Sequence, residues 1–226
     1  MKRPITTLFL LISLDGKIST GANDALDFDK DFPNIAGVKE GLHQYYKIER
    51  TTDLWSINSG RVMAKVGANE RSLPDKLDVS FVVIDNSHLT SKGVEYFSKL
   101  AKKFVLVTSN TTHPAYKTEA DNINIIYQKT FNPAEVLNCL YEDYGCDRVT
   151  IQTGGTLNEI FLREKLLDYV DIVVAPILVG GKDTPSLIDG YSLLSQSEIN
   201  KLGVLKLEEC TALEGSYVRL RYKVVS

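Results

Sequence analysis

The residues best suited to chemistry in this chain are Gly154-Gly155-Thr156, which stand between an apolar run and an amphipathic run. The run Val149–Gln152 predicts a buried strand, and Leu157–Leu166 has the apolar spacing of a helix. This turn would place free backbone N–H groups and the positive end of a helix dipole at the carboxyl end of a strand, where a phosphate group can bind. The glycines allow close approach to an anion, and Thr156 can cap the helix or donate to phosphate. Taken alone, the pattern also fits an ordinary strand–turn–helix crossover.

Four other predicted strands end in glycine, hydroxyl or amide groups. In parallel sheets, ligands collect at the carboxyl ends of the strands, so these segments are candidates for one binding site. Two of the five strand ends precede helices and could hold the pyrophosphate and the 2′-phosphate of a dinucleotide. A Gly-x-Gly-x-x-Gly fingerprint is absent, which argues against an ordinary Rossmann domain. The four further strand ends are Ser13–Ser19, Ser59–Val62, Thr108–Asn110 and Pro176–Lys182.

The elements that must position these residues alternate along the chain, which predicts βαβ units and an α/β fold with a mostly parallel sheet flanked by helices. The end of the chain predicts an antiparallel hairpin, because two strand-like runs flank Glu214-Gly215-Ser216. No linker or repeat is apparent, so we expect a single domain over residues 1–226. The predicted strands are Thr6–Ile12, Asp53–Asn58, Ser80–Asp85, Phe104–Thr108, Asn124–Tyr127, Val149–Gln152, Val170–Ala175, Val204–Leu213 and Tyr217–Val225. The predicted helices are Val38–Glu49, Arg61–Val66, Gly93–Ala101, Ala134–Tyr144 and Leu157–Leu166, and Asn132-Pro133 is the expected start of the fourth.

The composition excludes several classes of protein. The 226 residues carry a net charge of −3 with no long basic run, so we expect no nucleic-acid partner. No run approaches the roughly 20 apolar residues of a membrane span, and the first residues lack a signal-peptide cleavage site. Three cysteines without a Cys-x-x-Cys pair fit reduced thiols and a cytoplasmic location. Three scattered histidines predict no metal site, and the acidic segment Asp27–Asp31 lacks the pattern of a calcium loop, so we expect a solvated or substrate-covering loop there.

Three motifs carry a family resemblance: Ser13–Ile18, Gly154–Leu157, and Leu167–Asp171 followed by Ala175–Gly181. In this order they resemble the reductase domain of riboflavin biosynthesis, which has a dihydrofolate-reductase-like fold, and the resemblance covers nearly the whole chain. It implies an NADPH-dependent reductase that converts the ribosylamino side chain of a pyrimidinone phosphate to a ribityl chain, usually as a homodimer. Since the chain has no zinc-deaminase signature, we expect only the reductase activity.

The resemblance also implies roles for individual residues. Lys17, with Asp15 in the same Asp-Gly-Lys motif, would lie beside the substrate ribose and supply a proton or positive charge. Without the family, Lys17 also fits a solvated turn lysine. Expected cofactor contacts are Gly154, Gly155, Thr156 and Leu157 at the pyrophosphate, Thr108 and Ser109 at the adenosine ribose and its phosphate, Ser59, Gly60 and Arg61 at the nucleotide-side turn, and Gly180 and Gly181 at the nicotinamide. Expected substrate contacts are Ser13, Asn69, Arg71 and Ser72.

Two positions depart from the family pattern and leave other functions open. Gln152-Thr153 stands where the riboflavin enzymes commonly have a glutamate ahead of the glycines, and a neutral amide cannot act as a carboxylate. The segment Asn69–Ser72 matches the substrate-phosphate segment poorly, because Glu70 lies beside Arg71. The alternatives are a reductase of the same fold acting on a pterin-like or small carbonyl or imine compound, and a nucleotide-binding protein without turnover.

Overall fold

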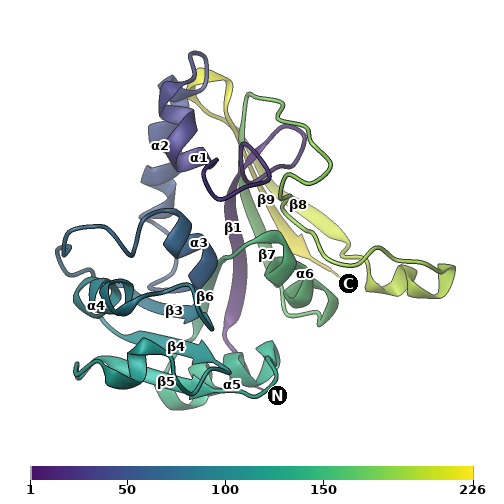
Figure 1. Ribbon diagram of the computed structural model, residues 1–226. Helices are drawn as coiled ribbons and strands as arrows, with labels where there is room; N and C mark the ends of the chain where they lie inside the picture. Colours follow the sequence, from purple (N-terminus) through teal and green to yellow (C-terminus); the bar gives the residue numbers. More distant parts are fainter. Residues whose placement is uncertain (1, 226) are drawn as a thin grey trace. The chain divides into compact units, whose positions relative to one another are not determined.

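The structure, a computed structural model, describes residues 2–225, which divide into two compact units. Unit 1 comprises residues 2–4 and 53–153, and unit 2 comprises residues 5–52 and 154–225. A division into compact units does not decide whether the chain folds as one domain, so the single domain over 1–226 stays a prediction. Each unit contains strands with helices packed beside them (Figure 1).

Unit 1 is built on a parallel sheet with the strand order β5-β4-β3-β2-β6. Its apolar core on one face combines α4 with the neighbouring strands, where Phe97 stacks on Phe104. Helix α5 buries Val136, Leu137 and Leu140. The strands are β2 (Trp55–Ser59), β3 (Ser80–Ile84), β4 (Phe104–Thr108), β5 (Ile123–Tyr127) and β6 (Arg148–Gln152), and the helices are α3 (Gly60–Lys65), α4 (Ser91–Leu100), the 3₁₀ turn η2 (Pro114–Lys117) and α5 (Pro133–Tyr144).

The helix ends of unit 1 follow the local sequence. Asn132 accepts the Ala134 and Glu135 amides at the start of α5, which confirms the predicted Asn-Pro start. The same helix ends at Gly145, whose φ of 67° is left-handed and therefore favours glycine. Thr90 caps the start of α4 as Asn132 caps that of α5, with its side chain accepting from Gly93 N–H.

Unit 2 pairs β1 with β7 in parallel and completes its sheet with two antiparallel strands, β9 beside β7 and β8 at the edge. The core on one face combines β1 and β7 with α2, and Phe9 stacks on Tyr45. The strands are β1 (Ile5–Ser13), β7 (Tyr169–Ala175), β8 (Leu205–Ala212) and β9 (Val218–Val224). The helices are α1 (Phe28–Asp31), α2 (Lys39–Glu49) and α6 (Gly155–Arg163), with 3₁₀ turns η1 (Phe32–Asn34), η3 (Gln196–Lys201) and η4 (Glu214–Ser216).

The segment 27–31 forms a short helix where the sequence predicted a loop. Asp27 caps α1 by accepting from Asp29 N–H, and Asp31 in turn accepts from Asp27 N–H at 2.9 Å. Phe28 and Phe32 stack on each other and are buried in the core of unit 2. The acidic side chains therefore cap and anchor a helical turn, and this turn allows the neighbouring Phe28 and Phe32 to be buried on one face.

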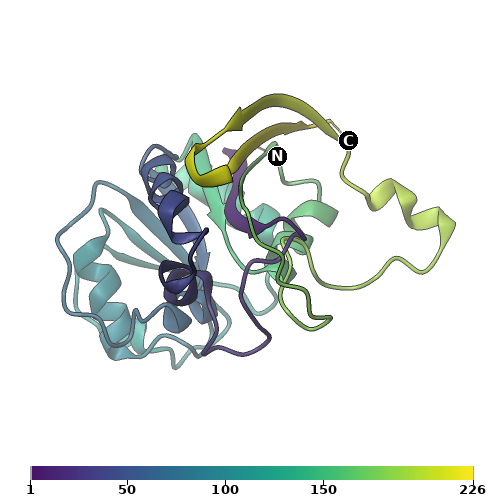
Figure 2. The same ribbon diagram turned by 90° about the horizontal axis from the view of Figure 1, so that it is seen from above.

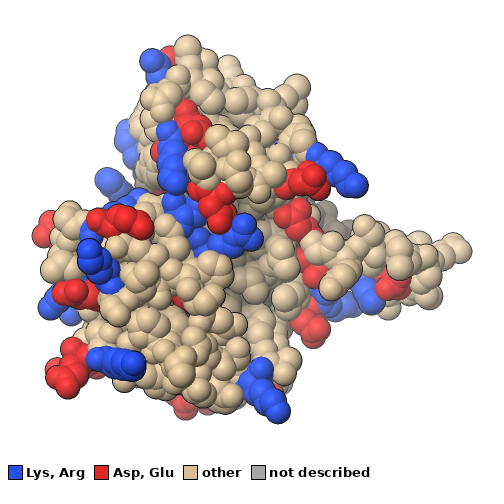
Figure 3. All heavy atoms as spheres, viewed as in Figure 1, with Lys and Arg blue, Asp and Glu red and all other residues tan. Residues whose placement is uncertain are grey.

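The predicted fold class is confirmed in its main features, a mixed α/β arrangement with parallel strands and a C-terminal antiparallel hairpin. Every predicted strand and helix is present, with ends displaced by a few residues. On the face drawn in Figure 3, acidic and basic side chains are interspersed, as the nearly balanced charge implies. Among the described residues, no helix combines the length and the apolar character needed to cross a membrane.

Candidate functional site

In unit 1, the candidate residues gather where β2, β3 and β4 end at their carboxyl edge. These three strands are neighbours in the parallel sheet, so their ends lie side by side. The segments at these strand ends are Ser59–Arg61, Asp85–His88 and Thr108–Asn110. The first and third were predicted from the sequence, and the middle segment was not.

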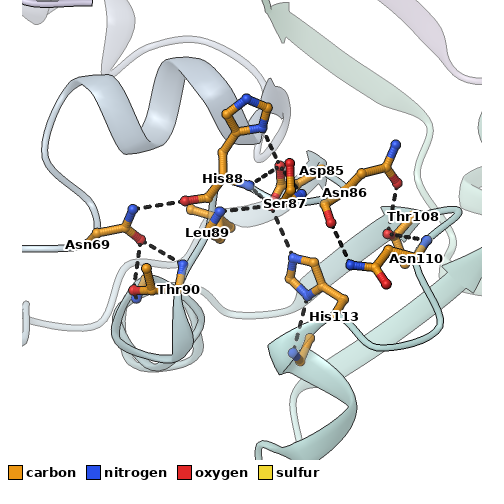
Figure 4. A network of polar contacts seen from close by, with 12 residues as sticks. Asn69, Asp85, Asn86, Ser87, His88, Leu89, Thr90, Thr108, Asn110 and His113 are labelled. Carbon is orange, nitrogen blue, oxygen red and sulfur yellow. Dashed lines mark hydrogen bonds and ion pairs between the residues drawn. The ribbon is translucent and has the colours of Figure 1, made fainter.

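Asp85 holds this edge together, and sequence reasoning missed it. Its carboxylate accepts hydrogen bonds from the backbone N–H groups of Ser87, His88 and Leu89 at 2.8–3.2 Å. Two imidazoles contact the same carboxylate: His88 Nδ1 lies 2.9 Å from Oδ1, and His113 Nε2 lies 3.0 Å from Oδ2 (Figure 4). Burial by itself would raise the pKa of Asp85, but these hydrogen bonds hold the pKa well below its usual range. Asp85 is therefore an anion at neutral pH.

His113 is fully buried, and its hydrogen bonds define which ring nitrogen carries the proton. Nδ1 accepts from Ala115 N–H at 3.2 Å, so the proton of the neutral ring lies on Nε2 and points at Asp85. His113 is therefore a buried histidine with both ring nitrogens hydrogen-bonded within unit 1. A histidine within a polar segment gives no signal that it will be buried, since the burial depends on the contact with Asp85, 28 residues away.

Asn86 joins the end of β3 to the end of β4. Its Oδ1 accepts from Thr108 Oγ1 at 3.0 Å, from Ser109 N at 2.8 Å and from Ser109 Oγ at 3.0 Å. Its backbone carbonyl accepts from Asn110 Nδ2 at 2.7 Å. Thr108 is buried and Ser109 is exposed, so Ser109 is the better placed of the predicted pair to meet a ligand. Its hydroxyl is already directed at Asn86.

The predicted nucleotide-side turn lies at the start of α3. Ser59 is buried and caps the helix by accepting from Val62 N–H, and Arg61 is exposed. A Cβ on Gly60 would overlap the Asp85 carboxyl group. Glycine is needed at this position because the start of the helix packs directly against that carboxyl group.

The predicted substrate-phosphate residues of unit 1 fall into two groups. The Asn69 side chain is engaged within the unit, where Nδ2 donates to His88 O and Oδ1 accepts from Thr90 N and Thr90 Oγ1, each at 2.9–3.1 Å. Asn69 therefore positions the 88–90 segment. Arg71 and Ser72 are exposed, and their contact with substrate stays a prediction, as does that of Asn69.

In unit 2, Ser13, Asp15 and Lys17 form one hydrogen-bonded turn after β1. Ser13 is fully buried, and its Oγ donates to Asp15 Oδ1 at 2.6 Å while accepting from Lys17 N–H at 2.9 Å. The Asp15 carboxylate also accepts from Val179 N at 3.0 Å and from Gly180 N at 2.6 Å. These bonds connect the turn after β1 to the turn after β7.

Hydrogen bonds from Ser13 and from the amides of Val179 and Gly180 lower the pKa of Asp15 to about 2. Asp15 is therefore ionised at neutral pH and cannot donate a proton, so a role as general acid does not fit its surroundings. It fixes the exposed pair Gly180 and Gly181 instead, whose φ angles of 73° and 82° are left-handed. A catalytic role for Asp15 beyond this positioning stays a prediction.

Lys17 lies on the segment that pairs with the loop after Gly181. Its Nζ donates to Thr184 O at 2.9 Å and to Ser186 Oγ at 3.2 Å, and its backbone forms a bridge with Ser186. The ammonium carries three N–H groups, so two protein contacts leave one for a ligand. The residue is half-buried, and the two hydrogen bonds of its ammonium distinguish it from the solvated turn lysine of the alternative interpretation.

In the Gly154-Gly155-Thr156 turn, the residue that caps the helix and the reason for the glycines differ from those expected. Gly154 is the N-cap of α6 and Gly155 is its first residue, so Thr156 lies in the first turn and is not the N-cap. A Cβ on Gly155 would overlap Ser186 O and the Asp189 carboxylate. Asp189 N–H donates to Gly155 O at 3.1 Å. The absence of a side chain at Gly155 thus accommodates the 186–189 loop, and contact of Gly154–Leu157 with a cofactor stays a prediction.

Other chemistries find little support among residues 2–225. This part of the chain has no cluster of three metal-ligating side chains. Burial raises the pKa of Cys139 to about 11 and that of Cys146 to about 12, so neither is a thiolate at neutral pH. Gln152 is held by Ser56, which donates to its Oε1 at 3.0 Å.

The comparisons with known proteins decide the family. The sequence profile of the RibD C-terminal domain matches residues 4–216, which is most of the chain. This chain belongs to the RibD C-terminal domain family.

Relatives of this RibD-type chain carry reductase names. It is 36% identical over 212 residues to a protein of Archaeoglobus fulgidus named 2,5-diamino-6-ribosylamino-4(3H)-pyrimidinone 5′-phosphate reductase, covering 88% of this chain and 93% of that protein. A protein of the same name from Methanothermobacter thermautotrophicus is 23% identical over 209 residues, covering 88% and 90%. Acinetobacter baumannii RibD has the same fold, with a TM-score of 0.68 at 19% identity, and the chain spans 99% of its own length and 59% of that structure.

Proposed function

We propose that this protein is an NADPH-dependent reductase that converts the ribosylamino side chain of a pyrimidinone 5′-phosphate to the ribityl form. The similarity to the Archaeoglobus reductase, at 36% identity over nearly the full length of both proteins, is the observation that carries this proposal. Each unit supports it separately. Unit 2 holds the hydrogen-bonded ammonium of Lys17, and unit 1 has a polar edge where strands β3 and β4 end.

The residues fit a nicotinamide dinucleotide. The carboxyl edge of unit 1 presents hydroxyl and amide groups from Ser109 and Asn86, and the turn of unit 2 presents Gly180 and Gly181, which are exposed and carry no Cβ that could exclude a ring. When bound, NADPH would supply a hydride to C1′ of the substrate.

Lys17 is the residue that this proposal assigns to proton supply or charge stabilisation. Reduction of the glycosylamine adds a hydride to C1′ and requires a proton at the nitrogen or at the ring-opened oxygen. The Lys17 ammonium carries three N–H groups and retains one beyond its bonds to Thr184 and Ser186. Asp15, ionised at neutral pH, would position the adjoining turn.

The proposal includes a homodimer formed through the edge of unit 2. Strand β8 is exposed on both faces almost throughout, and it carries Leu205 and Leu207, which are 42% and 50% exposed. The segment before β8, residues 190–204 with the 3₁₀ turn η3, runs outward from the rest of unit 2 in both ribbon views (Figures 1 and 2). In this segment Tyr191 is 91% exposed and Leu194 is 90% exposed. Apolar residues on an unpaired edge strand favour pairing with a second copy. Sedimentation should show a dimer that Leu207→Lys weakens, and a monomeric wild-type protein would refute this part.

The three free cysteines suit a reducing cytoplasmic compartment, which we include in the proposal.

The function is tested by incubating the purified protein with NADPH and 2,5-diamino-6-ribosylamino-4(3H)-pyrimidinone 5′-phosphate, and identifying the product by mass spectrometry. We expect a product with two additional hydrogens, formed in step with NADPH oxidation. A pterin-like or other imine compound reduced in its place would refute the substrate assignment. NADPH binding without any turnover across the panel would refute the enzyme assignment.

A further inference from the structure

We propose that Ser186 and Asp189 are positioning residues for Lys17. Both lie on residues 182–189 of unit 2, a segment that we call the strap, and neither belongs to the motifs that the sequence singled out. Ser186 holds the Lys17 ammonium directly, and Asp189 holds Ser186. The inference rests on the proposed function of Lys17, and it names the residues that fix the direction of the ammonium.

The strap pairs with the turn of Lys17 as a short antiparallel ribbon. Lys17 and Ser186 lie opposite each other in this pairing, with one backbone hydrogen bond on each side of them. This is the non-hydrogen-bonded type of antiparallel pair, in which the two side chains lie closest together. The backbone therefore sets the side chain of residue 186 beside that of Lys17. The two flanking bonds run from Ile18 N to Pro185 O and from Leu187 N to Gly16 O, each at 3.0 Å.

Two oxygens of the strap accept from the Lys17 ammonium. Thr184 O lies 2.9 Å from Nζ, and Ser186 Oγ lies 3.2 Å from it. Thr184 is buried and Ser186 is half-buried, so water competes with these bonds less than it does at an exposed lysine. Two fixed acceptors on one ammonium define the direction of its third N–H. Of the two, only the Ser186 hydroxyl belongs to a side chain.

Asp189 ties the far end of the strap to α6. Its carboxylate accepts from Ser186 N–H at 3.1 and 3.2 Å, and its own N–H donates to Gly155 O at 3.1 Å. A Cβ on Gly155 would overlap this carboxylate, so the carboxylate lies against the first residue of the helix. That end of a helix is positive and favours an anion. Asp189 thereby holds the backbone of Ser186 where its hydroxyl meets Lys17.

Asn158 on α6 provides a second tie. The residue is fully buried, and its Nδ2 donates to Leu187 O at 2.8 Å. The strap is thus hydrogen-bonded to the turn of Lys17 on one side and to α6 on the other. A group that is held in place before the substrate binds needs no reorganisation during the reaction, and small displacements of such a group lower the rate.

The first test measures the NADPH-dependent reduction of 2,5-diamino-6-ribosylamino-4(3H)-pyrimidinone 5′-phosphate by Ser186→Ala. We expect kcat to fall by about 10-fold, with KM for this substrate and the affinity for NADPH within about 2-fold, because a displaced ammonium affects the transition state more than binding. Ser186→Thr keeps the hydroxyl and suits extended backbone, so it should restore most of kcat. Ser91→Ala is the matched control, since Ser91 is an exposed serine on α4 in unit 1, and it should change none of these values.

A double substitution tests whether Ser186 acts through Lys17. If its only role is to place the ammonium, Ser186→Ala should not lower kcat further once Lys17→Met has removed that group. A further loss of about 10-fold in the Lys17→Met background would overturn the proposal, because independent effects add in free energy. An unchanged kcat in Ser186→Ala alone would also overturn it.

The role of Asp189 is tested with two substitutions. Asp189→Ala removes the acceptor of Ser186 N–H and should reproduce the loss of kcat, whereas Asp189→Asn keeps an oxygen for that bond and should retain most of the activity. A kcat of Asp189→Ala equal to that of wild type would overturn the role assigned to Asp189.

A measurement without substrate separates this inference from the proposed function. In ¹⁵N NMR of the protein alone, the signal of the Lys17 ammonium is identified by its loss in Lys17→Met, and the exchange of its hydrogens with water is measured. We expect Ser186→Ala to accelerate this exchange by about 5-fold, equivalent to roughly 1 kcal/mol.

The two failures give different results. Accelerated exchange in a protein that reduces no pyrimidinone phosphate would retain the contact between Ser186 and Lys17 and refute the proposed reaction. Reduction of the pyrimidinone phosphate, with exchange and kcat both unchanged in Ser186→Ala, would retain the reaction and overturn the positioning role.

Discussion

Replacing Asp85 with asparagine should destabilise unit 1 and change the tautomer of His88. The substitution keeps the size of the side chain but replaces one oxygen with an NH₂ group. If Nδ2 takes the place of Oδ2, it faces the N–H groups of Leu89 and His113. His113 cannot change tautomer freely, because its Nδ1 accepts from Ala115. Nδ2 should therefore take the place of Oδ1, where the half-exposed His88 ring can change tautomer and accept from it, although the Ser87 amide then loses its acceptor.

The cost follows from the bonds that remain. The amides of Leu89 and His88 and the ring of His113 would still donate to an oxygen, but without its charge. Hydrogen bonds to charged groups contribute about 1.5–3 kcal/mol and neutral bonds about 0.5–1.5 kcal/mol, so each of the three bonds weakens by about 1–1.5 kcal/mol and together they imply a loss of about 3–4.5 kcal/mol. Asp85→Ala should cost more, since it leaves buried donors without an acceptor.

Urea unfolding followed by circular dichroism measures this loss, with the exposed Asp78→Asn as the matched control. The folded-state pKa of Asp85 lies below its ordinary value of about 3.9. Its contribution is therefore fully present above pH 4 to 5 and is lost as the pH falls toward the folded-state value. The difference between wild type and Asp85→Asn should be constant from pH 6 to 8 and should shrink on acidification. A difference below about 0.5 kcal/mol at pH 7 would refute the role assigned to Asp85.

Three further predictions concern unit 2. Lys17→Met should lower turnover by about 100-fold or more with NADPH affinity nearly unchanged, and a near-normal kcat on the true substrate would contradict its role in proton supply or charge stabilisation. Because its Nζ also bonds to Thr184 and Ser186, unfolding measurements should show a loss of about 1 kcal/mol, above the 0.5 kcal/mol expected of a solvated lysine. Gly154→Val should weaken NADPH binding by about 10-fold while the fold persists, and unchanged affinity in a fluorescence titration would place the pyrophosphate elsewhere. The difference in unfolding free energy between wild type and Asp15→Asn should be constant between pH 5 and 8. Below pH 4 this difference should decline, because Asp15 is protonated as the pH falls toward its pKa of about 2. A difference that persists undiminished at pH 2 would contradict the bonds assigned to this carboxylate.

The sequence predicted the strands and helices because their signals are local. Apolar β-branched runs such as that of β4 are continuous, and Asn132-Pro133 is a start signal that needs no tertiary context. The short helix α1 was not predicted, since its stability comes from burying Phe28 and Phe32 in the core of unit 2. Helices of a single turn have little intrinsic stability and depend on such packing.

The candidate site was predictable only where strand ends carry distinctive residues. Thr108, Ser109 and Lys17 could be identified this way, but the partners that orient them could not. Asp85 follows its strand as an ordinary turn residue, and nothing local shows that the buried His113 will contact it. The carboxylate of Asp15 likewise receives amides 164 and 165 positions away. These roles arise from long-range contacts, which a single sequence does not reveal.

The most direct test of the proposed reaction uses NADPH that carries deuterium at the transferable position of nicotinamide C4. The protein is incubated with the deuterated cofactor and the pyrimidinone phosphate, and the product is examined by NMR. The account predicts one deuterium at C1′ of the ribityl chain, because the hydride passes directly from the cofactor to that carbon. A product without deuterium at C1′, or with deuterium in the pyrimidine ring, would contradict it.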